Sequence, residues 1–293
     1  MDKNKGRIKI TVRKNPRSLR KCEKGVSPAI STVILTSAVV VMLIVAIVFA
    51  NNFLNARMAE NEFSAVKQFM QTVGLQVDDV AWIIGRTQTL RYASRFGEVK
   101  FETLALNYSV FLNDNPVAAF FNTTGVLLFN MPIDKYNMGN DYYQRVVPPS
   151  SGSFLQKGTS APVCHIFIVE KVPMNDGNFI RIVVAPSIRM LNTTITTNGT
   201  VRNYFKFYLP VLNQTSHPRL SQSITLISNS VSVKTESGVN KIKIRVDFPK
   251  EASAGLGNDF FKFANIDEIV NTPSGSVIEF YTSEVTVSLG RHV

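Results

Sequence analysis

The sequence has few of the residues on which catalytic and metal sites depend. Its 293 residues include only two cysteines, three histidines and one tryptophan. Two cysteines exclude a disulfide-rich scaffold, and no His or Cys pairs have the spacing of a zinc site. Phosphate-binding loops, dinucleotide-binding glycine motifs and nucleophile elbows are missing as well. We therefore expect that the protein is not an enzyme and holds no metal and no cofactor.

One neighbouring pair, Cys164 and His165, combines a thiol with an imidazole. The pair lies in an apolar stretch that favours a strand, where neighbouring side chains point to opposite faces. The two groups therefore cannot hold one metal ion together, and we expect Cys164 to be a buried structural residue.

Acidic residues are scarce at the N-terminus of a chain whose formal net charge is +11. Residues 1–25 hold ten of the 32 Lys and Arg against Asp2 and Glu23, so this arm carries +8 and the remainder only +3. A nearly neutral body lacks the basic surface that is typical of nucleic-acid binding. We therefore expect no nucleic-acid partner.

Ionisable side chains are absent altogether from Val26 to Ala56. The centre of this stretch, residues 30–49, is apolar except for four Ser and Thr. About 20 such residues suffice for a helix across a hydrocarbon core of about 30 Å. The basic residues precede this span, and only Arg57 and Lys67 occur in the next 25 positions. The positive-inside rule predicts a single-pass protein in contact with membrane lipid, with a cytoplasmic N-terminus and an extracellular C-terminal part.

The junction between the basic arm and the apolar span reads Gly25-Val26-Ser27-Pro28, followed by Ala-Ile-Ser-Thr. Ser27 is a good N-cap and Pro28 fits the first helical position, so the helix is expected to start at Ser27. These residues resemble the class III signal peptide of archaeal type IV pilin-like proteins. The resemblance, confined to the N-terminal segment, implies removal of leader 1–25 between Gly25 and Val26 by a prepilin peptidase. It also implies that helix 26–56 is retained as membrane anchor and filament core.

Beyond the span, apolar residues recur every three or four positions, which predicts an amphipathic helix over residues 57–85. No proline falls between Pro28 and Pro116, so we expect one helix from Ser27 to about Ile84, on the order of 85 Å long. We favour packing of the apolar stripe on the protein's own globular head, with Trp82 as a core aromatic residue. A parallel coiled coil between two anchored copies is the alternative. The stripe consists of Phe63, Val66, Met70, Val73, Val77, Val80 and Ile84.

The remaining residues, 86–293, alternate between apolar and polar side chains and predict a β-rich head. We expect an α+β protein in which an antiparallel, sandwich-like sheet packs on the long helix. The expected elements are a connector at 85–97, strands at 98–112, 117–129 with a break at 122–125, 163–172, 178–185, 205–211, 223–235 and 241–248, a turn at 236–240, a helix at 258–270 and a strand pair within 276–289.

A loop rich in Gly, Pro, Ser, Tyr and Asn is expected over residues 132–162. Loops of this length in compact domains are usually functional. Because we expect the side chains of Tyr136, Tyr142 and Tyr143 to be exposed, the loop is the best candidate for a contact surface.

Asn-X-Ser/Thr sequons offer candidate glycosylation sites, which an extracellular head would present to the modifying enzymes. Asn107 lies in an alternating strand, whereas Asn122, Asn192 and Asn198 are expected in turns and are better acceptors. The five sequons start at Asn107, Asn122, Asn192, Asn198 and Asn213.

Two functions fit these features. The first is a pilin-like surface protein, exported through a class III signal peptide and assembled with copies of itself or with other pilin-like subunits. The large head favours a minor or adhesive filament subunit. The second is a membrane-anchored extracellular binding protein that does not polymerise.

Overall fold

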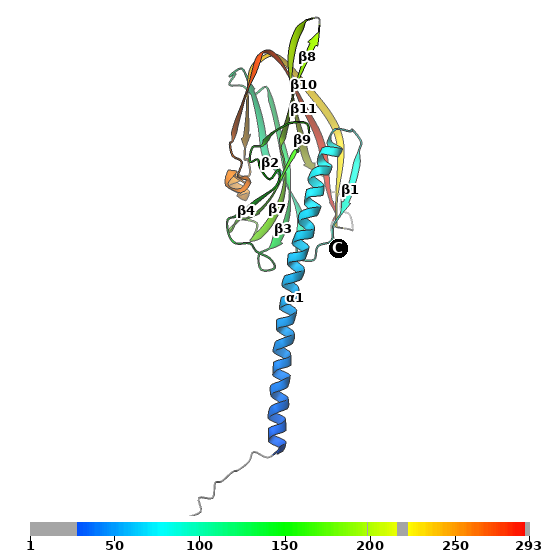
Figure 1. The fold of residues 1–293 in the computed structure, drawn as a ribbon, viewed down its shortest axis with the longest axis vertical. Helices are drawn as coiled ribbons and strands as arrows, with labels where there is room; N and C mark the ends of the chain where they lie inside the picture. Colours follow the sequence, from blue (N-terminus) through cyan, green and yellow to red (C-terminus); the bar gives the residue numbers. More distant parts are fainter. Residues whose placement is uncertain (1–27, 198, 216–221, 291–293) are drawn as a thin grey trace, which may run out of the picture. The chain divides into compact units, whose positions relative to one another are not determined.

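The computed structural model describes residues 28–197, 199–215 and 222–290, whose arrangement is shown in Figure 1. The chain divides into two compact units, Met1–Asn52 and Phe53–Val293. The expected leader 1–25, the cleavage site at Gly25 and Val26 and the expected helix cap Ser27 lie outside the described residues.

Helix α1 covers Pro28–Ala81 and is 54 residues long. It ends three residues before Ile84, which is 64% exposed, so the prediction of its C-terminus was wrong. The carbonyl oxygen of Ala81 accepts hydrogen bonds from the hydroxyl groups of Ser228, at 3.1 Å, and Ser283. In a longer helix this carbonyl would accept a hydrogen bond from a backbone amide of the next turn. The two hydroxyls replace that amide, and the chain then leaves the helix and enters the sheet.

The eleven described strands form one mostly antiparallel sheet, in the order β4-β6-β7-β3-β2-β10-β11-β9-β8-β5, and β1 pairs with β10. Only the β11–β9 and β5–β8 pairs are parallel. A long helix on a largely antiparallel sheet confirms the expected α+β class. The strands are β1 (Thr87–Arg91), β2 (Glu98–Leu112), β3 (Phe120–Pro132), β4 (Tyr142–Val147), β5 (Leu155–Lys157), β6 (Cys164–Glu170), β7 (Phe179–Pro186), β8 (Ile188–Thr197), β9 (Thr200–Gln214), β10 (Ser223–Asp247) and β11 (Asp267–Gly290).

Strands β10 and β11 stay paired along most of their 25 and 24 residues. The turn expected at 236–240 is instead a bulged bend within β10, and the strand pair expected within 276–289 is a single strand. Gly238 in β10 and Gly275 in β11 have positive φ angles of 73° and 80° at this bend. Because both strands have a glycine that tolerates this conformation, they bend together rather than reverse. One continuous sheet thereby acquires two arms. Strands β4, β6, β7, β3 and β2 lie on one side of the β10–β11 pair, and strands β9, β8 and β5 lie on the other.

The two arms face each other across a hydrophobic core, as the layers of a sandwich do. Phe120 of β3 stacks on Phe280 of β11 with ring centroids 5.1 Å apart. The Leu212 amide of β9 donates a hydrogen bond of 2.9 Å to the hydroxyl of Thr124 in β3, although β9 and β3 are not neighbours in the sheet. The sandwich-like core is therefore made by one bent sheet rather than by two separate sheets.

The helix expected at 258–270 is wrong beyond its first turn. Two four-residue helices, α2 (Glu251–Ala254) and α3 (Asn258–Phe261), are followed by extended chain. Lys262 adopts a left-handed conformation, and the Asn258 side chain accepts a hydrogen bond of 3.2 Å from the Phe263 amide. The turn places three aromatic residues in the core between the arms, namely Phe260, Phe261 and Phe263.

Four further sequence predictions for the head were incomplete. The connector 85–97 contains β1, the loop 132–162 contains β4 and β5, and β8 was not predicted. Residues 122–125 continue strand β3, because Asn122–Thr124 pair with Leu106–Tyr108 of β2. Short or polar edge strands carry little hydrophobic periodicity, and pairing with a neighbouring strand determines their conformation.

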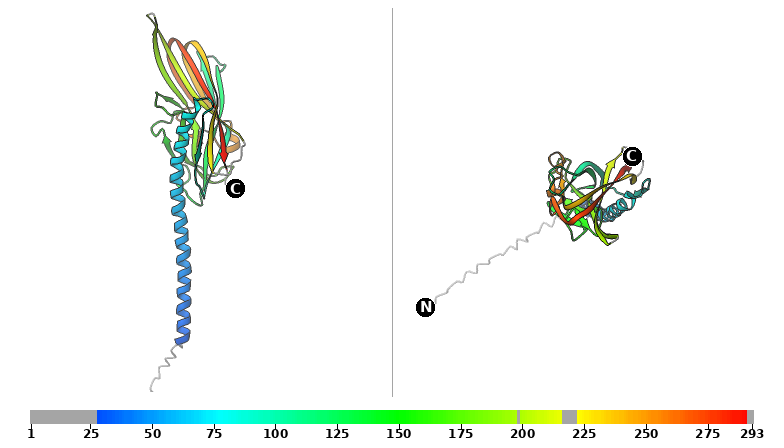
Figure 2. Two further views of the ribbon diagram at one scale, coloured as in Figure 1. Left: turned by 90° about the vertical axis from the view of Figure 1, so that its right-hand side faces the viewer. Right: turned by 90° about the horizontal axis from the view of Figure 1, so that it is seen from above.

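A second core lies between the sheet and the part of α1 that belongs to the head. Figure 2 shows this part of α1, in cyan, along one face of the sheet. Six of the seven residues of the predicted stripe, all except Ile84, are at most 5% exposed and pack against β3, β6 and β7. Packing on the head is therefore confirmed, and the stripe is not free for a coiled coil.

Candidate functional site

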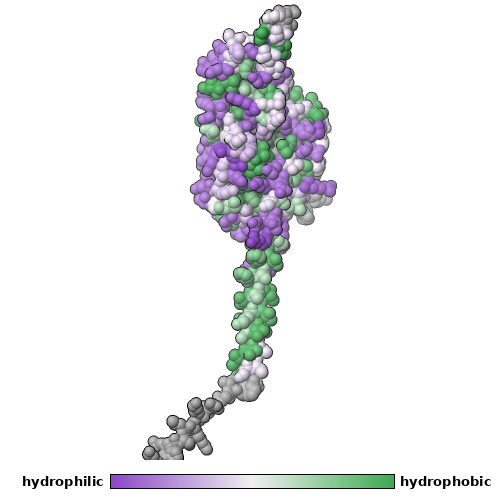
Figure 3. Space-filling view, viewed as in Figure 1, coloured by the Kyte–Doolittle hydropathy of each residue, from purple (hydrophilic) through white to green (hydrophobic). Residues whose placement is uncertain are grey.

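The strongest functional feature of the described chain is the first part of α1. Every side chain from Ala29 to Asn52 is exposed, and the most apolar 18-residue window of the helix has a mean hydropathy of 3.0. In Figure 3 the hydrophobic colour covers this segment, whereas the visible face of the head is mostly hydrophilic. Among the described residues, this is the one helix long and apolar enough to cross a membrane. Such a helix fits a membrane span and a signal sequence alike.

Three polar side chains near the start of this segment hydrogen-bond within the helix. The hydroxyls of Thr32, Thr36 and Ser37 donate to backbone carbonyls one turn earlier, at 2.9 Å in each case. Polar groups in a hydrocarbon environment need such internal partners because no water is available. These three hydroxyls can therefore lie in lipid or against other apolar helices without being unpaired.

The C-terminal end of α1 is held to the sheet by a polar cluster. The two carboxylate oxygens of Asp78 accept hydrogen bonds of 2.8 Å from the Trp82 indole and from Arg189 of β8. The Arg189 guanidinium also lies 5.2 Å from the ring centroid of Tyr208, and Trp82 meets the same ring edge-on. Trp82 joins helix and head as expected, although it is half-buried at the margin of the core. No sequence pattern pointed to its partner Arg189.

Glu62 holds α1 to the segment that follows β1. Its carboxylate accepts hydrogen bonds from the Ser94 hydroxyl at 2.5 Å and from the backbone amides of Arg95 and Phe96 at 2.9 and 3.0 Å. Three donors on one carboxylate fix this loop relative to the helix.

Helix α1 approaches the sheet closely at Gly74. A Cβ atom at this position would lie 2.6 Å from the Cδ1 atom of Ile166 in β6. The missing side chain therefore lets the helix backbone pack directly on β6 and β7.

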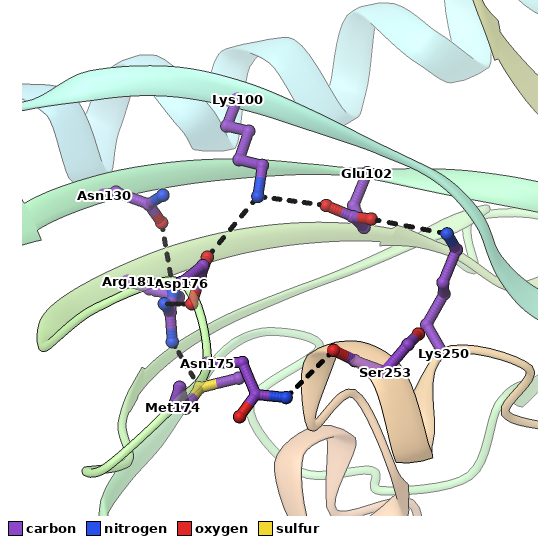
Figure 4. Close-up of polar contacts among 9 residues, drawn as sticks. All are labelled: Lys100, Glu102, Asn130, Met174, Asn175, Asp176, Arg181, Lys250 and Ser253. Atoms are coloured by element: carbon purple, nitrogen blue, oxygen red, sulfur yellow. Dashed lines mark hydrogen bonds and ion pairs between the residues drawn. The ribbon is translucent and has the colours of Figure 1, made fainter.

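A second polar cluster, shown in Figure 4, surrounds Arg181 of β7, whose side chain is 1% exposed. Its guanidinium donates to Asn130 at 3.1 Å, to Asp176 at 2.5 Å and to the sulfur of Met174. Burial lowers the pKa of Arg181, and Asp176 opposes this shift by stabilising the charged form. Met174 and Asp176 both belong to the turn between β6 and β7. Their hydrogen bonds with the buried guanidinium therefore hold this turn in position.

The same network extends to α2 through a chain of ion pairs. Lys100 lies 3.5 Å from Asp176 and 3.2 Å from Glu102, which in turn lies 3.9 Å from Lys250. The network thus ties the turn, strand β2 and the start of α2 together (Figure 4).

The three tyrosines expected on an exposed loop are half-buried, so the expectation of their exposure was wrong. The Tyr136 ring lies 4.9 Å from that of Phe63, and the Tyr142 hydroxyl lies 3.2 Å from the side-chain oxygen of Gln144. The Tyr143 hydroxyl donates to the Phe261 carbonyl at 2.8 Å, and burial raises the pKa of Tyr143 to about 12. A contact role for this loop stays a prediction.

The sequons differ in the accessibility of their asparagines. Asn192 in β8 and Asn213 in β9 are exposed, whereas Asn107 and Asn122 lie half-buried in β2 and β3 rather than in turns. The side-chain oxygen of Asn107 is buried without a hydrogen-bond partner in the described structure. Asn198 lies outside the described residues, and use of any sequon stays a prediction.

Cys164 and His165 point to opposite sides of β6, as expected from strand geometry. Cys164 packs in the core beneath α1, and burial, with a smaller effect of Asp78, raises the pKa of its thiol far above the usual range. His165 Nε2 donates to the Ser153 carbonyl at 2.9 Å, and burial lowers the pKa of His165 to about 4. Within the described residues, no three His, Cys, Asp or Glu side chains are grouped to hold a metal ion.

The buried His165 should make stability depend on pH. Its pKa is about 4 in the folded chain against 6.5 for the free side chain, so folding favours the neutral form. The free energy of unfolding is therefore unaffected by this group above about pH 6.5. It falls by roughly 3 kcal/mol in total as the pH drops from 6.5 towards 4, because the unfolded chain then binds a proton that the folded chain does not. Urea unfolding of the detergent-solubilised chain between pH 7 and 4 measures this loss. His165→Gln should unfold with a smaller pH dependence in this window, and equal slopes would contradict the assignment.

Comparison with known proteins assigns no family. Neither a protein-family model, nor a curated protein, nor a solved structure matches the chain.

Proposed function

We propose that the protein is a pilin-like surface protein that is exported through a class III signal peptide and assembles as a minor or adhesive filament subunit. The observation that carries the proposal is the two-part helix α1. Its first part exposes mostly apolar side chains and no charged ones, and its second part is buried against the head. The motif from Gly25 to Thr32 supports the export route.

Assembly would follow from removal of the basic leader. Before cleavage, each copy carries a net +8 next to its apolar helix, and like charges of this size oppose close packing of neighbouring copies. After cleavage between Gly25 and Val26, the apolar segments can pack on one another and replace contacts with lipid. The charged arm thus keeps the protein in the cytoplasmic membrane with its head outside until the peptidase acts.

The alternative function is a membrane-anchored extracellular binding protein that does not polymerise. It needs only the anchor and the head, which comprises 208 residues from 86 to 293, and no contact between copies. The two functions share the signal peptide and the span, and they differ in whether the mature helices leave the lipid.

The first experiment tests processing. We expect mass spectrometry of the chain, co-produced with a prepilin peptidase, to find an N-terminus at Val26. Gly25→Val should abolish this cleavage, whereas Gly6→Ala, a matched glycine change within the leader, should leave it intact. An uncleaved wild-type chain in the presence of an active peptidase would refute the class III assignment.

A second experiment separates the two functions. Electron microscopy of cells that produce the processed chain should show filaments labelled by an antibody against the head. Labelled membrane without filaments would favour the anchored binding protein.

A further inference from the structure

The β8–β9 hairpin presents an unpaired strand edge. Strand β5 pairs only with Ile188–Met190 at the start of β8. Beyond this point, β8 is paired on one side with β9, and no other described strand reaches its outer edge. The hairpin is visible at the top of Figure 1, where the β8 label marks it.

The direction of the free backbone groups follows from the contacts with β5. The Ile188 amide donates to the Phe154 carbonyl at 2.9 Å, and the Met190 carbonyl accepts from the Gly158 amide at 3.1 Å. Backbone groups alternate in direction along a strand, so the even-numbered residues of β8 point outwards. The outward N–H and C=O groups beyond β5 therefore belong to Asn192, Thr194 and Thr196.

This edge lacks the protection that sheet edges usually have. Residues 191–197 read Leu-Asn-Thr-Thr-Ile-Thr-Thr, without charge, proline or glycine. Three other edges carry charged side chains, with Arg91 in β1, Arg145 in β4 and Lys234 in β10. Because charges at an edge oppose pairing with another chain, the exposed and uncharged β8 edge is suited to pairing.

We propose that the β8 edge is an interaction surface for a second copy of this chain. Two β8 strands pair antiparallel about a two-fold axis at Thr194, so that Thr194 faces its counterpart and Asn192 faces Thr196. This register uses all three outward residues of both strands and makes six backbone hydrogen bonds. A shift of the axis to Thr193 would make only four. No like charges meet in the chosen register, because residues 191–197 carry no charge.

The tip of the hairpin gives a reason for the occupant to be another β8 strand. Strand β11 pairs with β9 only from Tyr204 onwards, so Thr194–Thr197 and Thr200–Asn203 form a ribbon of two strands. Two-stranded ribbons are marginally stable in water, and Ile195 and Val201 are exposed by 46% and 58% in this ribbon. Pairing of two tips makes four strands and places Ile195 beside Thr193 of the second copy.

Site-specific disulfide formation tests the proposal. Thr194→Cys is introduced into the full-length Cys22→Ser chain, produced in bacteria without N-glycosylation and solubilised in detergent. Facing residues of a hydrogen-bonded pair have Cα atoms about 5.5 Å apart, which suits a disulfide. Copper-phenanthroline oxidation of Thr194→Cys should therefore yield about tenfold more covalent dimer than oxidation of the matched control Val201→Cys. Val201 is exposed in the same hairpin but lies in β9 and not on the β8 edge. Equal yields from the two variants would overturn the proposal.

A proline at the edge provides the second variant. Thr196→Pro removes an N–H that points outwards, so the fold of the single chain keeps its hydrogen bonds. Adding it to Thr194→Cys should reduce dimer formation to the level of Val201→Cys while circular dichroism stays unchanged. An undiminished dimer in this double variant would also overturn the proposal.

Discussion

Replacing Asp176 with asparagine should lower the free energy of unfolding by about 3 kcal/mol, because the buried guanidinium of Arg181 then lacks its carboxylate partner. Removal of one member of a buried ion pair typically costs about 3–5 kcal/mol. We expect the lower end of this range, because Asp176 itself is 29% exposed and water can replace part of the lost interaction. Urea unfolding of the detergent-solubilised chain, followed by circular dichroism, measures the change.

The matched control replaces the cation. Asp176→Asn combined with Arg181→Met removes the buried charge altogether and should recover most of the lost stability, because an apolar side chain of similar length fills the site. Asn130 then loses its 3.1 Å donor, so recovery is incomplete. A double variant as unstable as Asp176→Asn alone would show that the ion pair is not the source of the effect.

Val77→Asp should detach α1 from the sheet. Val77 is 0% exposed in the core beneath the helix, so a carboxylate there has no water and no cation to stabilise it. We expect a loss of at least about 3 kcal/mol in the free energy of unfolding. Limited proteolysis of the detergent-solubilised chain should then cut within residues 53–81, which the folded wild type protects.

Leu75→Asp is the control for this change. Leu75 lies two residues away on the same helix but is 60% exposed, so its replacement adds the same charge without burying it. The control should keep the protease resistance of the wild type. Equal sensitivity of both variants would mean that the charge, and not its burial, loosens the helix.

The long helix and its two halves could be predicted because each rests on a local pattern. The uncharged run from Val26 to Ala56 and the stripe from Phe63 to Val80 are visible in sequence. The described part of the run is exposed from Ala29 to Asn52, and the stripe is buried. The end of the helix could not be predicted. It depends on Ser228 and Ser283, which are more than 140 positions away.

The sheet was predicted least well where glycine and asparagine occur inside strands. Gly238 suggested a reversal of the chain, but each strand of the pair bends around its own glycine, Gly238 or Gly275, and then continues. Asn122 suggested a turn, although its backbone pairs with Tyr108 in the neighbouring strand. Such positions are ambiguous in a single sequence, because the neighbouring strand decides between a turn and a bulge.

The Arg181 cluster left no signal in the sequence for a similar reason. Its members come from β2, β3, β7, a turn and α2, and no spacing connects them. Only the fold brings them together.

The position of β11 has a consequence for when the head can fold during synthesis. This strand, Asp267–Gly290, is the last of the described strands in sequence, yet it lies between β10 and β9 in the middle of the sheet. Until it emerges from the ribosome, β10 and β9 have no common neighbour, and the two arms lack the second of the strands that connect them. The nascent head therefore stays incompletely folded until β11 has been synthesised.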